Sequence, residues 1–202
     1  MQSENVYIGD DKFKNFLNHY KCPTDIYEVK LKFAGAICSP NVNLRPTDVI
    51  SSLFQENMQP RLETKDEANL FFKFFMGLWD EMFVQIRNNE LVLPKALKGS
   101  KEDLILLCNQ RSRQIECGFV EGFWGGLESL DIPSFAGELI NSLSDLAEAY
   151  YMLANKIKKM DDINDEIFKV IINMDKKVNE IFSFLIIHLV LPKIDELKKQ
   201  VN

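Results

Sequence analysis

The chain has 202 residues, of which 46% are hydrophobic and 27% are charged, and its formal net charge is −6. This composition is typical of a compact globular protein, and 15 phenylalanines against 9 glycines indicate a large aromatic core with few long loops. An acidic chain is not expected to bind nucleic acid. The longest apolar run, 181–191, is shorter than the roughly 20 residues that span a bilayer, so we expect no membrane partner.

The cysteine pattern indicates a reducing compartment. No two cysteines form a CxxC pair, and the polar segment 1–11 lacks the apolar stretch of a secretory signal peptide. We therefore expect reduced core thiols in a cytoplasmic protein, rather than disulfides or a zinc site. The four cysteines are Cys22, Cys38, Cys108 and Cys117.

The first two helices are predicted from apolar spacing and from residues typical of helix boundaries. Apolar residues at helical spacing predict a short amphipathic helix over 11–20. Asp25 and Glu28 form a pair that resembles a capping box, so a second helix is expected to begin there. Pro40 ends this helix, because a proline disfavours helical backbone at the residue before it.

Two more helices are expected before residue 90. Pro46 occupies a position that the first turn of a helix tolerates, and apolar residues follow it at helical spacing. Thr64 and Glu67 form a capping box, and the apolar positions after them predict a helix over 66–88. Residues 91–93 are the best candidate for a strand, but three residues are too few to form one.

The second half of the chain predicts three long helices. Ser100 is expected to cap a central helix over 101–129, and Pro133 marks a break and the start of the next helix. That helix frays near 158–162, and the last helix is predicted over 164–199. No segment alternates polar and apolar residues over the length of a strand with turn signals at both ends.

These elements predict an all-α fold, namely an orthogonal or irregular multi-helix bundle with long central and C-terminal helices and one shared core. We expect residues 1–24 to form an N-terminal arm with a short helix, and residues 25–202 to form a single helical domain. The charged segment 158–164 is interpreted as a loop between helices, because it lacks the Gly, Ser and Pro content of a domain linker.

Three glycines in the predicted central helix are the most informative local feature. Gly118, Gly122 and Gly126 are four residues apart, so they would share one stripe of a helix and let another backbone approach closely. Glycine otherwise costs a helix about 1 kcal/mol relative to alanine. The aromatic residues expected to fill space beside the stripe are Phe119, Phe123 and Trp124.

Two interpretations of this segment remain open. The glycines either allow close packing of two helices, or they form, with Trp79 and Trp124, the lining of a ligand cleft. Asp80 and Glu81 are the titratable groups whose presence in a cleft would favour the second interpretation. The candidate packing, partner or ligand residues are Trp79, Asp80, Glu81, Gly118, Gly122, Phe123 and Trp124.

We find no catalytic or metal-binding motif, so no catalytic residue, cofactor or metal ligand is expected. His19 is expected on the surface or at a helix end, and His188 as a hydrogen-bonded histidine of the core or of an interface. No HExxH or ExxH sequence occurs, and the carboxylates that follow Asp162 lack the glycine of an EF-hand loop. Cys117 is a minor candidate for a reactive thiol, with Arg113 one helical turn earlier.

The last predicted helix contains a stretch, Ile181–Leu191, that is apolar almost all round. Such a helix is either central to the core or shared with another subunit. Pro192 cannot donate a hydrogen bond to the carbonyl of His188, so a kink is expected there. We predict self-association, as a dimer, through this helix, with burial in the monomer core as the alternative.

Several stretches resemble the YecA/YgfB-like family of small bacterial proteins. They are 33–40 followed by 46–54, the Leu-Trp-Asp-Glu-Met of 78–82, and the Gly-Phe-Val-Glu-Gly-Phe of 118–123, within a similarity that covers roughly 25–150. The resemblance implies an all-helical bundle that often self-associates. Many YecA members also carry a zinc-binding tail rich in Cys and His, which is not expected in this chain, so the tail-less YgfB branch is the better match.

The resemblance implies no catalytic residue, and two hypotheses about function remain. The first is a regulatory or adaptor protein, not an enzyme, that acts by protein–protein contact with itself or with an unidentified partner. The second is a small-molecule binder or enzyme with a cleft near Trp79 and Trp124. A large apolar surface patch would favour the first hypothesis, and a cleft with titratable groups would favour the second.

Overall fold

The computed structural model describes residues 6–54, 59–161 and 165–194, and these residues contain helices and loops but no strand. The predicted all-α class is therefore confirmed. The helical elements are α1 (Asp10–His19), α2 (Ile26–Cys38), α3 (Pro46–Ser52), α4 (Lys65–Arg87), α5 (Lys101–Arg113), η2 (Gln114–Val120), α6 (Glu121–Trp124), α7 (Ser134–Lys158), α8 (Asp165–Leu185) and η3 (Ile186–Val190).

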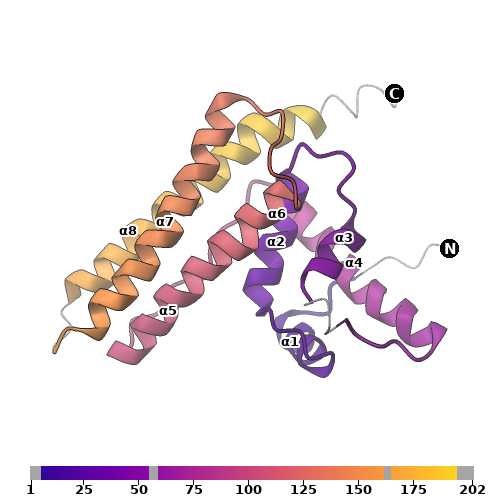
Figure 1. Cartoon of the computed structure of the whole chain (residues 1–202), viewed down its shortest axis with the longest axis horizontal. Helices are drawn as coiled ribbons and strands as arrows, with labels where there is room; N and C mark the ends of the chain where they lie inside the picture. The colour runs from indigo at the N-terminus through magenta and orange to yellow at the C-terminus, as the bar shows by residue number, and fades with distance from the viewer. Residues whose placement is uncertain (1–5, 55–58, 162–164, 195–202) are drawn as a thin grey trace.

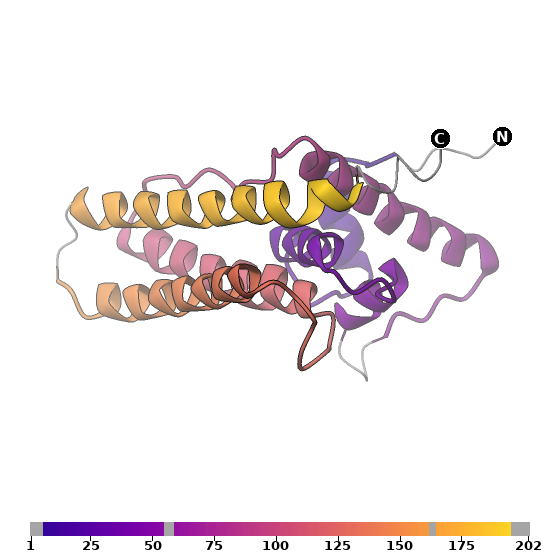
Figure 2. The same ribbon diagram turned by 90° about the horizontal axis from the view of Figure 1, so that it is seen from above.

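The helices form two groups that meet at the middle of the molecule. The long helices α5, α7 and α8 lie side by side as an elongated bundle, and α1 to α4 gather around one end of it (Figures 1 and 2). Helix α2 packs along η2 and α6, so it joins the two groups. One continuous cluster of buried apolar side chains runs through both groups. The expected single core is thus confirmed for the described residues.

We expected residues 1–24 to form an N-terminal arm with a short helix, and this helix, α1, packs into the core. Phe13 is fully buried, and its ring lies edge-on to that of Phe75 on α4, with centroids 5.4 Å apart. Phe16 contacts the rings of Phe71 and Phe74 on the same helix. The aromatic content of the N-terminal segment therefore holds α1 against α4.

The predicted helix starts are largely confirmed. Asp25 and Thr64 each accept hydrogen bonds from backbone N–H groups of the first turn, and Pro46 occupies the first turn of α3. Ser100 and Asp103 form a complete capping box. The other contact of the predicted capping box, between the Glu28 side chain and the N–H of Asp25, is not formed. Glu28 instead forms an ion pair with Arg113 on α5.

The capping box predicted at Thr64 and Glu67 is also only half formed. The Thr64 hydroxyl accepts from the Glu67 N–H at 3.1 Å, as expected. The Glu67 carboxylate, however, accepts from the N–H of Glu63 at 2.8 Å, one residue before the expected donor. Its other oxygen accepts a hydrogen bond from the hydroxyl of Tyr20, so it also links α4 to the end of α1.

The central helix is shorter than predicted and changes its winding. The chain stays helical from α5 through η2 and α6, and η2 is π-helical. The helix ends at Trp124 rather than near 129, because Gly125 adopts a left-handed backbone with φ of 57°. Glycine takes up this conformation without the steric cost that other residues incur, and it is a common way to end a helix.

The last helix also contains a π-helical segment, η3, which is separated from Pro192 by Leu191. The N–H of Leu191 bonds to the carbonyl of Ile186, five residues earlier. Pro192 has no N–H to donate to the carbonyl of His188. The backbone hydrogen bonds therefore change from the α-helical to the π-helical pattern beside the position where we expected a kink. The expected helix start at 164 and its end near 199 lie outside the described residues.

Candidate functional site

The predicted close approach of two backbones occurs between the glycine segment and α2. A Cβ atom added to Gly122 would overlap the carbonyl oxygen of Lys32 and lie 2.9 Å from its carbonyl carbon. On the other side of the contact, a Cβ on Gly35 would overlap the carbonyl oxygen of Phe119. Glycines on both helices therefore let the two backbones touch. The close-packing interpretation of Gly118 and Gly122 is confirmed.

Gly126 does not belong to this stripe. It lies beyond the end of α6 with φ of 80°, and nothing lies within 4 Å of the position that a Cβ atom would occupy.

The aromatic residues beside the stripe differ in their burial. Phe119 and Phe123 are fully buried, and the Phe119 ring lies 4.5 Å from that of Phe182 on α8. Trp124 is only half-buried, and it faces a pocket.

This pocket, which we call the Trp124 pocket, has a volume of about 490 Å³. It lies where α2, α3, η2, α6 and one turn of α7 meet, together with the loop that follows Gly125. The size falls within the range of small-molecule sites. Side chains of both kinds line it: the apolar Leu44, Val49 and Trp124, and the charged Lys32 and Glu121.

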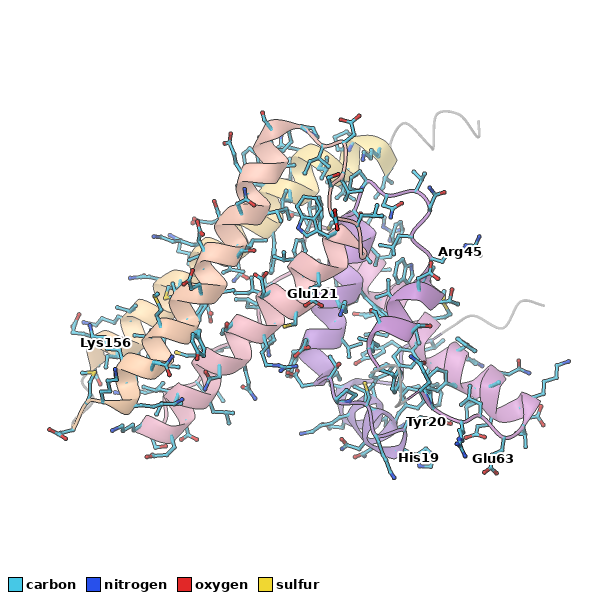
Figure 3. The ribbon with its side chains drawn as sticks, in the orientation of Figure 1. His19, Tyr20, Arg45, Glu63, Glu121 and Lys156 are labelled. Carbon is cyan, nitrogen blue, oxygen red and sulfur yellow. The ribbon has the colours of Figure 1, made fainter. Side chains whose placement is uncertain are left out.

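Lys32 and Glu121 form an ion pair on the wall of the pocket, with 3.0 Å between Nζ and Oε2. Figure 3 shows Glu121 on the central helix where it passes α2. The Lys32 side chain is 12% exposed and that of Glu121 is 53% exposed. A partly exposed pair of this kind contributes little to stability, about 1 kcal/mol or less, so it remains available to a ligand.

A second ion pair joins α2 to the central helix, one turn earlier on α2 and about two turns earlier on the central helix. Arg113 donates two hydrogen bonds to the carboxylate of Glu28, at 3.0 and 3.1 Å. Burial raises the pKa of Glu28 above its usual value, although Arg113 counteracts this effect. The pair aligns α2 with the central helix, and the glycines set their separation.

The structure does not bring the predicted cleft residues together. Trp79 packs on the ring of Phe33, with centroids 5.5 Å apart, and it does not line the pocket that contains Trp124. Asp80 is exposed on α4, and Glu81 accepts a hydrogen bond from Gln85 on the same helix. These three residues therefore belong to the surface of α4 and its contact with α2, whereas the pocket lies on another side of α2.

The structure defines the surroundings of the four cysteines and the two histidines. All four cysteines are free thiols, and burial, with a smaller contribution from Glu121, raises the pKa of Cys117. Arg113, which we considered as an activating cation, is paired with Glu28. His19 is exposed, as expected, but His188 is also exposed and is not a core histidine; its ring lies 4.1 Å from that of Phe184.

A buried polar network inside the long bundle was missed by the sequence analysis. Arg111, 2% exposed, donates two hydrogen bonds to Asp175, one to Gln114 and another to the carbonyl of Pro94. Tyr150 donates to the same carboxylate at 2.6 Å. Asp175 occupies a position of α8 where the helical spacing of the apolar residues calls for a core side chain. A carboxylate at such a position was the feature of the sequence that could have indicated the network.

An apolar face remains exposed near the end of the last helix. Phe184 is 45% exposed and Ile187 is 43% exposed, whereas their neighbours Leu185 and Ile186 are fully buried. The ring of Phe135 from α7 lies 6.0 Å from that of Phe184. The burial of Ile181–Leu191 is therefore one-sided. We call the exposed side, made of Phe184, Ile187 and His188, together with the half-buried Phe135 of α7, the apolar face.

Neither a metal cluster nor a membrane-spanning helix occurs in the described part of the chain. Its His, Cys, Asp and Glu side chains form no group of three or more that could hold a metal ion. None of its helices combines the length and the hydropathy that crossing a membrane requires. No family model, curated protein or solved structure matches this chain.

Proposed function

We propose that this protein is a non-enzymatic regulatory or adaptor protein that acts through protein–protein contact. In this proposal the first partner is a second copy of the chain, which binds at the apolar face. The observation that carries the proposal is the exposure of Phe184 and Ile187 in the middle of an apolar helical stretch. Exposed apolar side chains that adjoin one another are typical of interaction sites.

The chemistry of the apolar face favours self-association. The stretch Ile181–Leu191 contains no Asp, Glu, Lys or Arg. A face without charge is complementary to itself, because two copies bring together apolar groups without repulsion, and the two-fold symmetry of a dimer pairs identical patches. The rings of Phe184 and His188 lie against each other with an angle of 40° between their planes, and they offer aromatic surface of the kind that is enriched at interface centres.

The resemblance to the YecA/YgfB-like family and a cytoplasmic location are part of the same proposal. The all-helical fold and the contact of Gly118 and Gly122 with α2 support the resemblance, because the similar residues form the packing centre of the molecule. The free thiols support a reducing compartment. The acidic net charge supports partners other than nucleic acid.

Sedimentation equilibrium of the full chain tests the proposal. We expect the wild type to sediment at twice 23.4 kDa at micromolar concentration. Ile187→Asp should sediment as a folded monomer, because Ile187 is exposed in the single chain but an unpaired carboxylate is costly in an interface. A matched control is Ile172→Asp, since Ile172 lies on α8, before η3, and is 41% exposed; this variant should remain a dimer. A wild type that sediments at 23.4 kDa at all concentrations would exclude the dimer.

A second candidate function is favoured by the Trp124 pocket. The alternative hypothesis placed small-molecule binding at a cleft near Trp79 and Trp124, and the structure has a pocket that Trp124 lines and Trp79 does not. This pocket lies between α2, α3 and the end of the central helix, apart from the apolar face. Ligand binding and self-association are therefore separate properties that separate variants can test.

A further inference from the structure

A second pocket, of about 440 Å³, lies along the central helix, between this helix and the segment 94–99, and Tyr27 of α2 also lines it. The residues that the central helix contributes to the wall share one side of that helix. They are Asp103, Leu106, Leu107, Gln110, Arg111 and Gln114. From Asp103 to Gln114 the helix rises by about 16 Å, so the pocket is elongated. We call it the Gln114 groove.

Gln114 offers amide hydrogens that no described residue accepts. The residue is 2% exposed, and its Oε1 accepts a hydrogen bond from Nη1 of Arg111 at 2.9 Å. Its Nε2 donates to none of the described residues. The described side-chain atoms that are both sealed from solvent and without a partner are Asn89 Oδ1 and Glu116 Oε2, so Gln114 Nε2 keeps access to solvent. The groove is the opening that Gln114 lines.

Arg111 has an unused donor beside the same amide. A guanidinium has five N–H donors. Arg111 uses Nε and one hydrogen of Nη2 for Asp175, and the other hydrogen of Nη2 for the carbonyl of Pro94. One hydrogen of Nη1 is donated to Gln114, so the second hydrogen of Nη1 has no acceptor among the described residues. Neighbouring donors on Arg111 and Gln114 suit a carboxylate, which accepts hydrogen bonds on two oxygens.

This end of the groove also carries an unpaired positive charge. Lys95 lines the groove, and it directly follows Pro94, whose carbonyl is bonded to Arg111, so Lys95 lies at the same end as Arg111. Lys95 is exposed and forms no ion pair with any residue that the structure describes. Asp175 offsets the charge of Arg111, so Lys95 supplies the attraction for an anion.

The charges at the opposite end of the groove have partners. Asp103 accepts hydrogen bonds from the N–H and the hydroxyl of Ser100. It precedes Arg111 by eight residues, about 12 Å along the helix, so it opposes an anion beside Arg111 only weakly. Lys98 forms an ion pair with Asp165 at 2.6 Å. The attraction for an anion is therefore concentrated at the end near Gln114.

Apolar side chains line the groove between its two ends. Leu106 and Leu107 come from α5, and Leu97 comes from the segment 94–99. Leu97 and Leu106 are exposed, and Leu107 is half-buried. Covering these side chains would remove apolar surface from water, which is favourable. An aliphatic chain attached to the carboxylate would cover them.

We propose that the Gln114 groove binds an aliphatic monocarboxylate, such as a medium-chain fatty acid. The carboxylate accepts hydrogen bonds from Nε2 of Gln114 and Nη1 of Arg111, and Lys95 neutralises its charge. The aliphatic chain runs along α5 over Leu107 and Leu106. This inference rests neither on self-association through the apolar face nor on binding in the Trp124 pocket.

Isothermal titration calorimetry of the full chain with sodium octanoate tests the proposal. We expect saturable binding at one site per chain. 1-Octanol has the same chain without the charge and should bind at least about tenfold more weakly, because a charged acceptor forms the stronger hydrogen bonds. Equal affinity for 1-octanol would overturn the proposal, since apolar surface alone would then explain binding. Acetate that binds as tightly as octanoate would overturn it too, and so would a lack of saturable octanoate binding.

Variants at the two parts of the groove locate the ligand. Gln114→Glu keeps an acceptor for Arg111 but replaces the amide donors by a negative charge, so octanoate affinity should fall at least about tenfold. Leu106→Asp alters the apolar wall at a side chain that is 56% exposed, so the protein should remain folded, and it should weaken octanoate binding similarly. Its matched control is Leu70→Asp, on α4, where Leu70 is 50% exposed. Thermal melts establish that each variant is folded. Equal octanoate affinity of the two aspartate variants would overturn the assignment.

Lys95→Gln separates the charge from the apolar contact. It should weaken octanoate binding several-fold and leave the weak binding of 1-octanol unchanged, because only the carboxylate interacts with the ammonium group. Lys73→Gln is the matched control, since Lys73 is an exposed lysine on α4 that forms no ion pair within the described ranges. Octanoate affinity that falls equally in both lysine variants, or in neither, would place the carboxylate away from Lys95 and overturn the proposal.

Discussion

Arg111 on α5 and Asp175 on α8 form a two-pronged ion pair in the interior of the long bundle, with nitrogen–oxygen distances of 2.9 and 3.2 Å. Tyr150 on α7 adds a hydrogen bond to the same carboxylate, so all three long helices meet at one charged point. The guanidinium also donates hydrogen bonds to the side chain of Gln114 and to the carbonyl of Pro94. A buried ion pair is tolerated only when its charged groups have hydrogen-bond partners of this kind.

Removal of one member of this pair should destabilise the protein strongly. We expect Asp175→Ala to reduce the free energy of unfolding by about 3–5 kcal/mol, because Arg111 would remain buried without a counter-ion. The double variant Arg111→Met, Asp175→Leu should recover most of this loss. Glu180→Ala removes one partner of the exposed pair with Lys176 and should cost about 0.5 kcal/mol or less. Urea unfolding measures all three. A loss at Asp175 as small as that at Glu180 would contradict the buried pair.

Tyr150 makes stability depend on alkaline pH. Burial and the neighbouring Asp175 raise the pKa of Tyr150 well above its usual value of 10.0. The folded protein thus keeps this tyrosine neutral at a pH where the unfolded chain ionises it. Its contribution to stability is complete below about pH 10 and is lost as the pH rises above that value.

Tyr150→Phe tests this pH dependence. The variant should lose about 1–3 kcal/mol at neutral pH, because Asp175 loses a donor. Its free energy of unfolding should also fall less steeply than that of the wild type above pH 10. Some slope should remain, because burial also raises the pKa of Tyr7. Urea unfolding between pH 7 and pH 11 measures both effects. Identical slopes for the two proteins would contradict the assignment.

Gly122 should not tolerate even one added methyl group. A Cβ there would overlap the backbone of Lys32, so Gly122→Ala should cost at least about 1–3 kcal/mol as α2 is displaced. Gly137 is the matched control, because its Cβ position lies 3.8 Å from the nearest atom, the Cδ1 of Ile132, and the residue is in α7. Gly137→Ala should leave stability unchanged or raise it by up to about 1 kcal/mol. Thermal melts that rank the two variants in the opposite order would refute the close contact.

The thiols should react slowly in the folded protein. Burial raises the pKa of both Cys38 and Cys108 to about 12, and it also raises the pKa of Cys117. We expect little alkylation by iodoacetamide at pH 8 before unfolding and complete alkylation of the four cysteines after it. Mass spectrometry of peptides gives the extent at each site. Rapid modification of Cys117 in the folded protein would restore the reactive-thiol interpretation that the structure disfavours.

Local signals predicted the helices because they act within one or two turns of chain. Asp25, Thr64 and Ser100 each supply a side-chain oxygen to the first turn of a helix, and this contact needs no other part of the protein. Pro46 fits a first turn for a similarly local reason. The end of the central helix was harder to predict, since Gly125 and Gly126 both permit left-handed backbone and only the fold decides where it begins.

The sequence by itself determined that the chain is helical, where most helices begin, and that Gly118 and Gly122 admit a close neighbour. These properties depend on the residue types and on their spacing along one helix. Only the tertiary structure decided that α2 is this neighbour, that Glu28 pairs with Arg113, and that Trp124 lines the Trp124 pocket without Trp79. The reason is that such contacts join residues far apart in the chain, and the hydrophobic effect that assembles the helices favours burial of apolar surface without specifying the partner.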